Sequence, residues 1–134
     1  MQRGWPVYGF VAPAWLLGAG AWTALGDFPF SYTTTMRRFH LLPEREALFA
    51  PSMVYTVRSA WRRRMSCEWN SMLGMARNTP LARLSLHPAD AGYPQVVRHF
   101  QTLIETLLAR RQAMTKAMFA ALWRRKGPPR PSRE

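Results

Sequence analysis

A long stretch without charge near the N-terminus constrains this chain more than any other feature. From Trp5 to Gly26 no side chain is charged, and a helix needs roughly 20 mostly apolar residues to cross a bilayer. Aromatic residues stand near both ends, Trp5 and Tyr8 at one and Trp22 and Phe28 at the other, where membrane proteins carry interfacial aromatic belts. Residues 1–26 are therefore predicted to form a single transmembrane helix.

The composition of this stretch favours a helix that packs against other helices over one that is surrounded by lipid. Pro6, Pro13 and several glycines keep its hydropathy moderate. Small residues at Ala14, Gly18 and Ala21 would allow a neighbouring helix to approach closely. Two alternatives stay open, an apolar arm buried inside a complex and a retained signal anchor.

The basic residues are concentrated in the rest of the chain. Arg3 and Asp27 cancel one another in the part that ends at Met36, so the formal net charge of +12 arises entirely from Arg37 onward. A charge of this size on a small chain indicates an acidic neighbour, namely anionic lipid, nucleic acid or an acidic protein surface. Because basic segments next to a span tend to stay on the more negative side, the body is predicted to face the mitochondrial matrix.

Residues 27–51 are predicted to be a juxtamembrane connector. A hydroxyl-rich stretch in it leads into Arg37 and Arg38, a basic pair suited to phosphate headgroups beside a membrane. We assign both arginines as candidate ligands of an anionic lipid such as cardiolipin. An ordinary solvated loop with two arginines is the competing interpretation.

Residues 52–127 are predicted to form a two-helix basic body, whose first helix runs from Ser52 to about Arg77. Apolar residues recur along it at steps of three and four, which is one helical face: Val54, Val57, Trp61, Met65, Trp69, Met72 and Ala76. Such a stripe is usually part of the core. Arg62 and Arg63 lie off this face and are further candidate headgroup ligands. Indoles beside arginines are also typical of an RNA-binding surface, which is the alternative.

The second helix of the body is predicted from Pro94 to about Lys126, where Gly127 ends it. Its length of about 48 Å exceeds what a small core needs, so it is predicted to run along a partner. The candidate partner interface is an apolar seam of Val97, Phe100, Ile104, Leu107, Met114 and Met118. Arg111 interrupts this seam, and residues 128–134 form a basic, proline-rich tail that cannot fold alone.

No residue pattern points to catalysis. Cys67 is the single cysteine, which excludes an internal disulfide and a cysteine-based zinc site. The histidines are dispersed, and the sequence contains neither a P-loop, nor a dinucleotide fingerprint, nor a nucleophile elbow. The chain is therefore predicted not to be an enzyme, and no catalytic residue, metal or cofactor is assigned.

These patterns predict an all-α fold, with a single N-terminal transmembrane helix followed by an extended two-helix basic body and irregular connectors. The predicted function is that of a non-catalytic accessory subunit of a large mitochondrial inner-membrane complex, such as a respiratory-chain complex or ATP synthase. It would act in assembly and stabilisation, with other subunits and anionic lipid as partners. The alternative is an organellar ribosomal protein that binds rRNA, although arms that thread through rRNA are basic and the N-terminal segment is uncharged.

Overall fold

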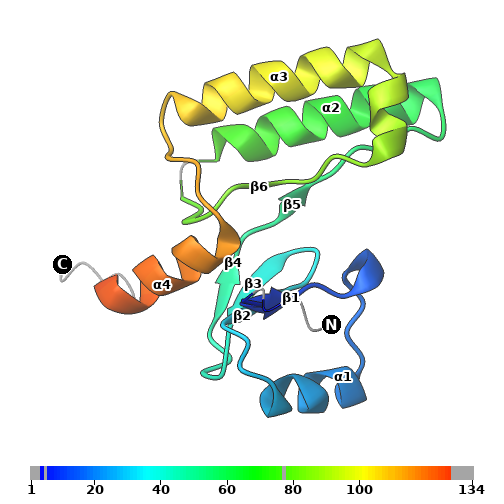
Figure 1. The fold of residues 1–134 in the computed structure, drawn as a ribbon. Coiled ribbons are helices and arrows are strands. Elements are labelled where there is room, and N and C mark those ends of the chain that lie inside the picture. The colour runs from blue at the N-terminus through cyan, green and yellow to red at the C-terminus, as the bar shows by residue number, and fades with distance from the viewer. Residues whose placement is uncertain (1–3, 5, 77, 128–134) are drawn as a thin grey trace. The chain divides into compact units, whose positions relative to one another are not determined.

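A computed structural model describes residues 4, 6–76 and 78–127 of the chain. It divides into two compact units, which are described separately (Figure 1). Unit 1 contains the residues up to Leu48 and those from Met114 onward, and unit 2 contains Phe49–Ala113. Within the described residues the strands form one four-stranded and one two-stranded sheet. The fold is therefore mixed α/β, and the prediction of an all-α fold is wrong.

The uncharged N-terminal segment is not a continuous helix. It is divided among strand β1 (Gly9–Phe10), the 3-10 helix η1 (Pro13–Trp15), helix α1 (Ala19–Ala24) and the 3-10 helix η2 (Leu25–Asp27). Pro13 lacks a backbone N–H, and Ala14 and Trp15 have left-handed φ angles of 51° and 57°, which interrupt an α-helix. Among the described residues no helix is long and apolar enough to cross a membrane, so the predicted transmembrane helix is wrong. Trp5 lies outside the described residues.

Unit 1 is built around a sheet with the strand order β1-β2-β3-β4, in which β2 is Tyr32–Thr34, β3 is Arg38–Leu41 and β4 is Ala47–Phe49. The connector predicted over residues 27–51 therefore carries three strands of this sheet. β1 runs parallel to β2, with Gly9 paired to Tyr32, and β3 runs antiparallel to β2. A Cβ at position 9 would lie 2.5 Å from a carbon of the Tyr32 ring, so the close approach of β1 requires glycine there.

Phe39 in β3 is at the centre of unit 1. Its side chain is fully buried, and its ring stacks on that of Tyr32 with the centroids 5.2 Å apart. The Phe119 ring, from helix α4 (Lys116–Lys126), meets Phe39 edge to face at 5.2 Å. This aromatic cluster packs α4 against the sheet, although the two segments are far apart in the sequence.

Polar contacts complete the attachment of α4. Trp123 Nε1 donates a hydrogen bond to Glu46 Oε1 (2.9 Å). The Arg124 guanidinium donates to both carboxylate oxygens of Glu44 (3.1 Å each) and to the Leu42 carbonyl. Arg124 also holds the pKa of Glu44 below its ordinary value, mainly through this hydrogen bond. Two acidic side chains of unit 1 are thus engaged within the unit.

Unit 2 pairs two helices with a small parallel sheet. Its elements are β5 (Ser52–Met53), α2 (Ala60–Met75), β6 (Arg83–Leu84), the 3-10 helix η3 (Pro88–Gly92) and α3 (Pro94–Leu108). Figure 1 shows α2 and α3 side by side. Buried Tyr55, Cys67 and Val96 form the core between them. The buried Arg83 guanidinium donates to the Ala50 carbonyl (2.6 Å), and desolvation lowers its pKa to about 10.

The long helix predicted from Pro94 to Lys126 is two helices. Its ends are where the sequence predicts them, because α3 begins at Pro94 and α4 ends at Lys126 before Gly127. Between them the chain leaves the helix after Leu108 and re-enters it with Thr115 as N-cap, whose Oγ1 accepts a hydrogen bond from the Met118 amide (3.1 Å). The prediction of one continuous helix is wrong.

Arg111 gives the physical reason for the interruption. Its guanidinium donates to the carbonyl oxygens of Thr79 (2.8 Å) and Ala76 (3.0 Å). Ala76 is the C-cap of α2, so Arg111 satisfies a carbonyl that the end of a helix leaves without a partner. This tertiary contact outweighs the local preference for continuing α3. The tail predicted over 128–134 lies outside the described residues.

We expect Phe39→Ala to lower the free energy of unfolding by about 3–5 kcal/mol, because it removes a buried ring that two other rings contact. Urea denaturation measures this loss. Phe28 is 57% exposed, so Phe28→Ala is the matched control, with an expected loss below about 1 kcal/mol. Equal losses for the two variants would contradict the central position of Phe39.

Candidate functional site

The outer side of helix α2 is apolar. The side chains of Trp61, Met65, Trp69, Met72 and Met75 are each between 58% and 64% exposed. At about 100° per residue these positions share one side of the helix, and we call this surface the α2 face. The apolar stripe predicted from the sequence therefore exists along α2, but it points outward, and its interpretation as core is wrong. Val54 and Val57, the first members of that stripe, precede the helix.

The opposite side of α2 carries small and polar residues and packs inward. Cys67 and Asn70 are buried there, and Asn70 Nδ2 donates a hydrogen bond to the Val54 carbonyl (2.9 Å). A Cβ at Gly74 would lie 2.6 Å from Cδ1 of the buried Leu103 in α3, so Gly74 permits the close approach of the two helices. Because α2 packs through this side, its tryptophans and methionines remain outside.

Arginines gather at the N-terminal end of α2. Arg58 precedes the helix, and Arg62, Arg63 and Arg64 lie in its first two turns, with no acidic residue in the first turn. The N-terminus of a helix already carries partial positive charge, so these cations are unfavourably placed unless an anion lies near them. The side chain of the N-cap residue Ser59 makes no capping hydrogen bond.

Two of these arginines were predicted headgroup ligands, and the structure gives them different surroundings. Arg63 is half-buried, donates to the Val57 carbonyl (3.2 Å) and lies over the Tyr93 ring, 4.4 Å from its centroid. Arg62 is exposed, with its guanidinium 5.6 Å from the centroid of the Trp61 ring. Arg62 is therefore available to a ligand at the edge of the α2 face, whereas Arg63 is engaged within unit 2.

A cleft of about 510 Å³ opens at the same end of α2. Arg58, Arg62 and His87 line it, together with the buried Asp90, which accepts a hydrogen bond from the backbone N–H of His87 (2.7 Å). The remaining lining residues are Tyr55, Thr56, Val57 and Ala89. Neither Arg58 nor His87 is predicted as a site residue from the sequence, because no spacing pattern links two residues that only the fold brings together.

Tyr55, which lines this cleft, belongs to a hydrogen-bonded network of neutral side chains. The Tyr55 hydroxyl is 2.9 Å from His99 Nδ1, and the Ser71 hydroxyl is 2.8 Å from His99 Nε2. Burial raises the pKa of Tyr55 to about 12 and lowers the pKa of His99 below its ordinary value of 6.5. Both groups are therefore uncharged at neutral pH, and the network ties α2 and α3 to the segment before α2.

The other two predicted headgroup ligands lie in unit 1. Arg37 is in the loop between β2 and β3, and Arg38 is the first residue of β3, and both are exposed. Neither lines the cleft. Their role as lipid ligands stays a prediction.

The predicted partner seam is distributed over both units. Val97, Phe100, Ile104 and Leu107 are half-buried on α3, where Phe100 packs against the core around Tyr55, Cys67 and Val96. Met114 and Met118 belong to unit 1, and Met118 is exposed on α4. The seam is thus not one continuous helical face, because α3 ends before Met114.

Cys67 is buried, and burial raises the pKa of its thiol, which disfavours the reactive thiolate. Within the described part of the chain no three His, Cys, Asp or Glu side chains are grouped so that they could hold a metal ion. Comparison with known protein families, with curated proteins and with solved structures finds no match.

The lowered pKa of His99 predicts how stability depends on pH. Unfolded His99 takes up a proton at its ordinary pKa of 6.5, whereas the folded protein resists this. Stability is therefore complete above pH 6.5 and is lost as the pH falls through the lower pKa of the folded state. His99→Gln keeps hydrogen-bonding capacity but does not titrate, so its urea midpoint should fall less steeply below pH 6.5 than that of the wild type.

Gln101 is exposed on the same helix, carries no titratable group and provides the control for this measurement. Gln101→Ala should retain the wild-type pH dependence of the urea midpoint. If His99→Gln also retains it, desolvation of His99 is not the cause.

Proposed function

We propose that this protein is a non-catalytic membrane-surface protein, which attaches to anionic phospholipid through the α2 face and the arginines beside it. The observation that carries the proposal is the outward orientation of two tryptophans and three methionines on α2. Contiguous apolar patches that are large are rare on soluble monomers and mark sites that bind a partner or a membrane.

The charge beside the α2 face favours an anionic occupant. Arg58, Arg62 and Arg64 are exposed at its N-terminal end, and the whole chain carries a formal net charge of +12. A second copy of the chain would bring the same positive charge and be repelled. An anionic surface with an apolar interior satisfies both the arginines and the apolar side chains.

A phospholipid surface suits this arrangement better than RNA. Single-stranded nucleic acid needs stacked aromatic side chains beside a basic track that follows its backbone. On α2, Met65 separates Trp61 from Trp69, and the arginines are confined to the first half of the helix. The negatively charged Glu68 is also exposed, after the last of these arginines. At a membrane surface, by contrast, indoles and flexible methionines enter the boundary between headgroups and acyl chains, while arginines at one end contact phosphates.

We retain the accessory role predicted from the sequence, but for a protein that attaches to the membrane surface. The protein would act in assembly and stabilisation beside a large membrane complex, with other subunits of that complex as partners. A membrane rich in anionic lipid suits the charge, such as a mitochondrial inner membrane that contains cardiolipin. Attachment through unit 2 needs no transmembrane helix and no cofactor.

Co-sedimentation with lipid vesicles tests this proposal. We expect the wild type to bind vesicles that contain phosphatidylglycerol, to bind pure phosphatidylcholine much more weakly, and to be released by salt. The double variant Trp61→Ser/Trp69→Ser should bind the anionic vesicles at least about tenfold more weakly, because it removes two indoles from the contact.

Phe49→Ser/Leu108→Ser is the matched control, since both residues are exposed apolar side chains of unit 2 outside the α2 face. It should bind vesicles as the wild type does, and urea denaturation checks that both double variants are folded. Equal binding by all three proteins would overturn the α2 face as the contact. If RNA displaces the vesicles and the tryptophan variant loses affinity for RNA, the rRNA-binding alternative replaces the proposal.

A further inference from the structure

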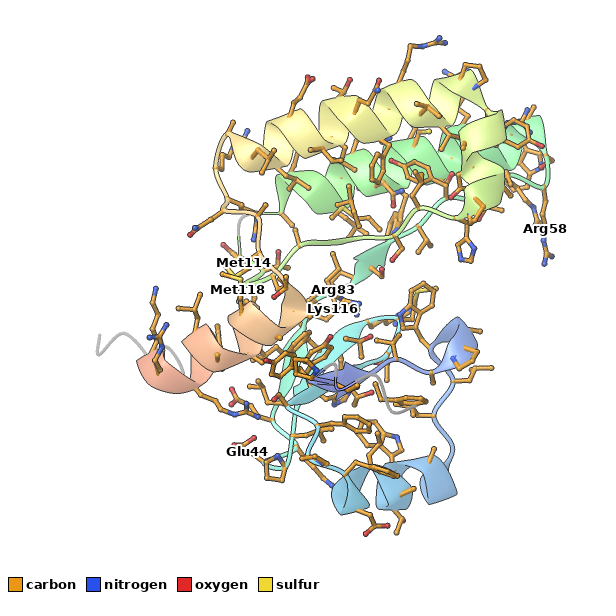
Figure 2. All side chains as sticks on the ribbon, in the orientation of Figure 1. Glu44, Arg58, Arg83, Met114, Lys116 and Met118 are labelled. Atoms are coloured by element: carbon orange, nitrogen blue, oxygen red, sulfur yellow. The ribbon has the colours of Figure 1, made fainter. Side chains whose placement is uncertain are left out.

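The cleft at the N-terminal end of α2 is a different surface from the α2 face, although Arg62 borders both. Its volume of about 510 Å³ lies within the range of roughly 300–1,000 Å³ that is usual for small-molecule sites. Arg58 and Arg62 supply two guanidinium groups and His87 an imidazole from a separate segment. Figure 2 shows Arg58 extending away from the ribbon at the loop before α2.

We propose that this cleft binds a phosphate group, and that the group is the phosphomonoester headgroup of an anionic lipid. The inference deepens the proposed function and rests on it for the source of the phosphate. Guanidinium groups bind phosphate oxygens with paired N–H donors, which makes arginine the preferred side chain for this ligand.

The two arginines of the cleft are not neutralised by a direct contact with any described residue. Among the described residues, neither Arg58 nor Arg62 forms a hydrogen bond or an ion pair with another side chain. Both arginine side chains are also exposed and can therefore reach a ligand from solvent. A phosphate between them would neutralise charges that otherwise repel one another.

The start of α2 borders the cleft, because Arg62 in its first turn is one of the lining residues. The first backbone N–H groups of a helix have no partner within the helix and attract anions. In α2 the side chain of Ser59 leaves them uncapped, and its own Oγ is buried without a hydrogen-bond partner in the described structure. A phosphate in the cleft would therefore lie near the positive end of the α2 dipole.

Asp90 is the one carboxylate that lines the cleft, and it opposes an anion there. Its side chain is 2% exposed and already accepts the His87 backbone N–H (2.7 Å). The Tyr55 hydroxyl is likewise engaged, with His99. The groups that remain for a ligand are thus Arg58 and Arg62, and their two positive charges outweigh the single negative charge of Asp90.

Titration of the full chain with inorganic phosphate at constant ionic strength, followed by amide NMR, tests the cleft without a membrane. We expect saturable shifts at Thr56, Val57 and His87, which line the cleft. Arg58→Gln should weaken phosphate binding about tenfold, as expected for the loss of a charge-assisted hydrogen bond. Arg110→Gln removes the same charge from an exposed position of unit 2 outside the cleft and outside the α2 face, and should leave phosphate affinity unchanged.

Absence of saturable shifts, or equal weakening by Arg58→Gln and Arg110→Gln, would overturn the phosphate site. Vesicle binding then identifies the source of the phosphate. Vesicles with phosphatidic acid, which carries a phosphomonoester, should bind more tightly than vesicles with the same content of phosphatidylglycerol, and Arg58→Gln should lose this preference.

The two proposals fail in different ways. If phosphate titrates the cleft but the wild type shows no preference for phosphatidic acid, the lipid headgroup is overturned as the source and free phosphate is the ligand. If phosphate binds the cleft saturably but the protein binds no vesicle, the proposed membrane function is wrong, whereas the phosphate site is retained.

Discussion

The close packing of α2 against α3 is the contact on which the rest of unit 2 depends. Gly74 removes the Cβ that would otherwise meet Leu103, and Asn70 finds its acceptor in the Val54 carbonyl. With this side of α2 turned inward, the helix can bury only small and polar groups against its own unit. The apolar side therefore remains exposed, which is why the proposed function rests on the α2 face.

The charge distribution also supports an anionic partner at the start of α2. The chain contains seven acidic residues and nineteen lysines and arginines. Several of the acidic side chains make hydrogen bonds within their own unit. Glu44 and Glu46 hold α4 to the sheet of unit 1, and Asp90 accepts the His87 amide in η3. Within the described residues the arginines at the start of α2 form no ion pair, and the helix N-terminus adds to their positive potential. The proposed external anion, a membrane surface along α2 or a phosphate in the cleft, would compensate this charge.

Local sequence rules predicted two helix ends correctly but not the start of α2, which begins at Ala60, whereas Ser52, its predicted N-cap, is in strand β5. Pro94 begins α3, and Gly127 follows the last residue of α4, as proline and glycine preferences require. The middle of the same segment could not be predicted, because Arg111 leaves the helix to bind the Ala76 and Thr79 carbonyls of a distant turn. Similarly, absence of charge marked the N-terminal segment as apolar, but only the pairing of Gly9 with Tyr32 shows that part of it is a strand.

The sequence by itself determined the inventory of the candidate site, namely tryptophans and methionines at helical spacing, beside arginines and within a strongly basic chain. It did not determine the direction of that helical face, because periodicity shows which residues lie together and not which side meets a core. Tertiary structure decided this through the close contact at Gly74. It also brought His87 to the same cleft as Arg58 and Arg62. His87 lines this cleft because η3 packs beside the start of α2, and no local sequence pattern predicts that packing.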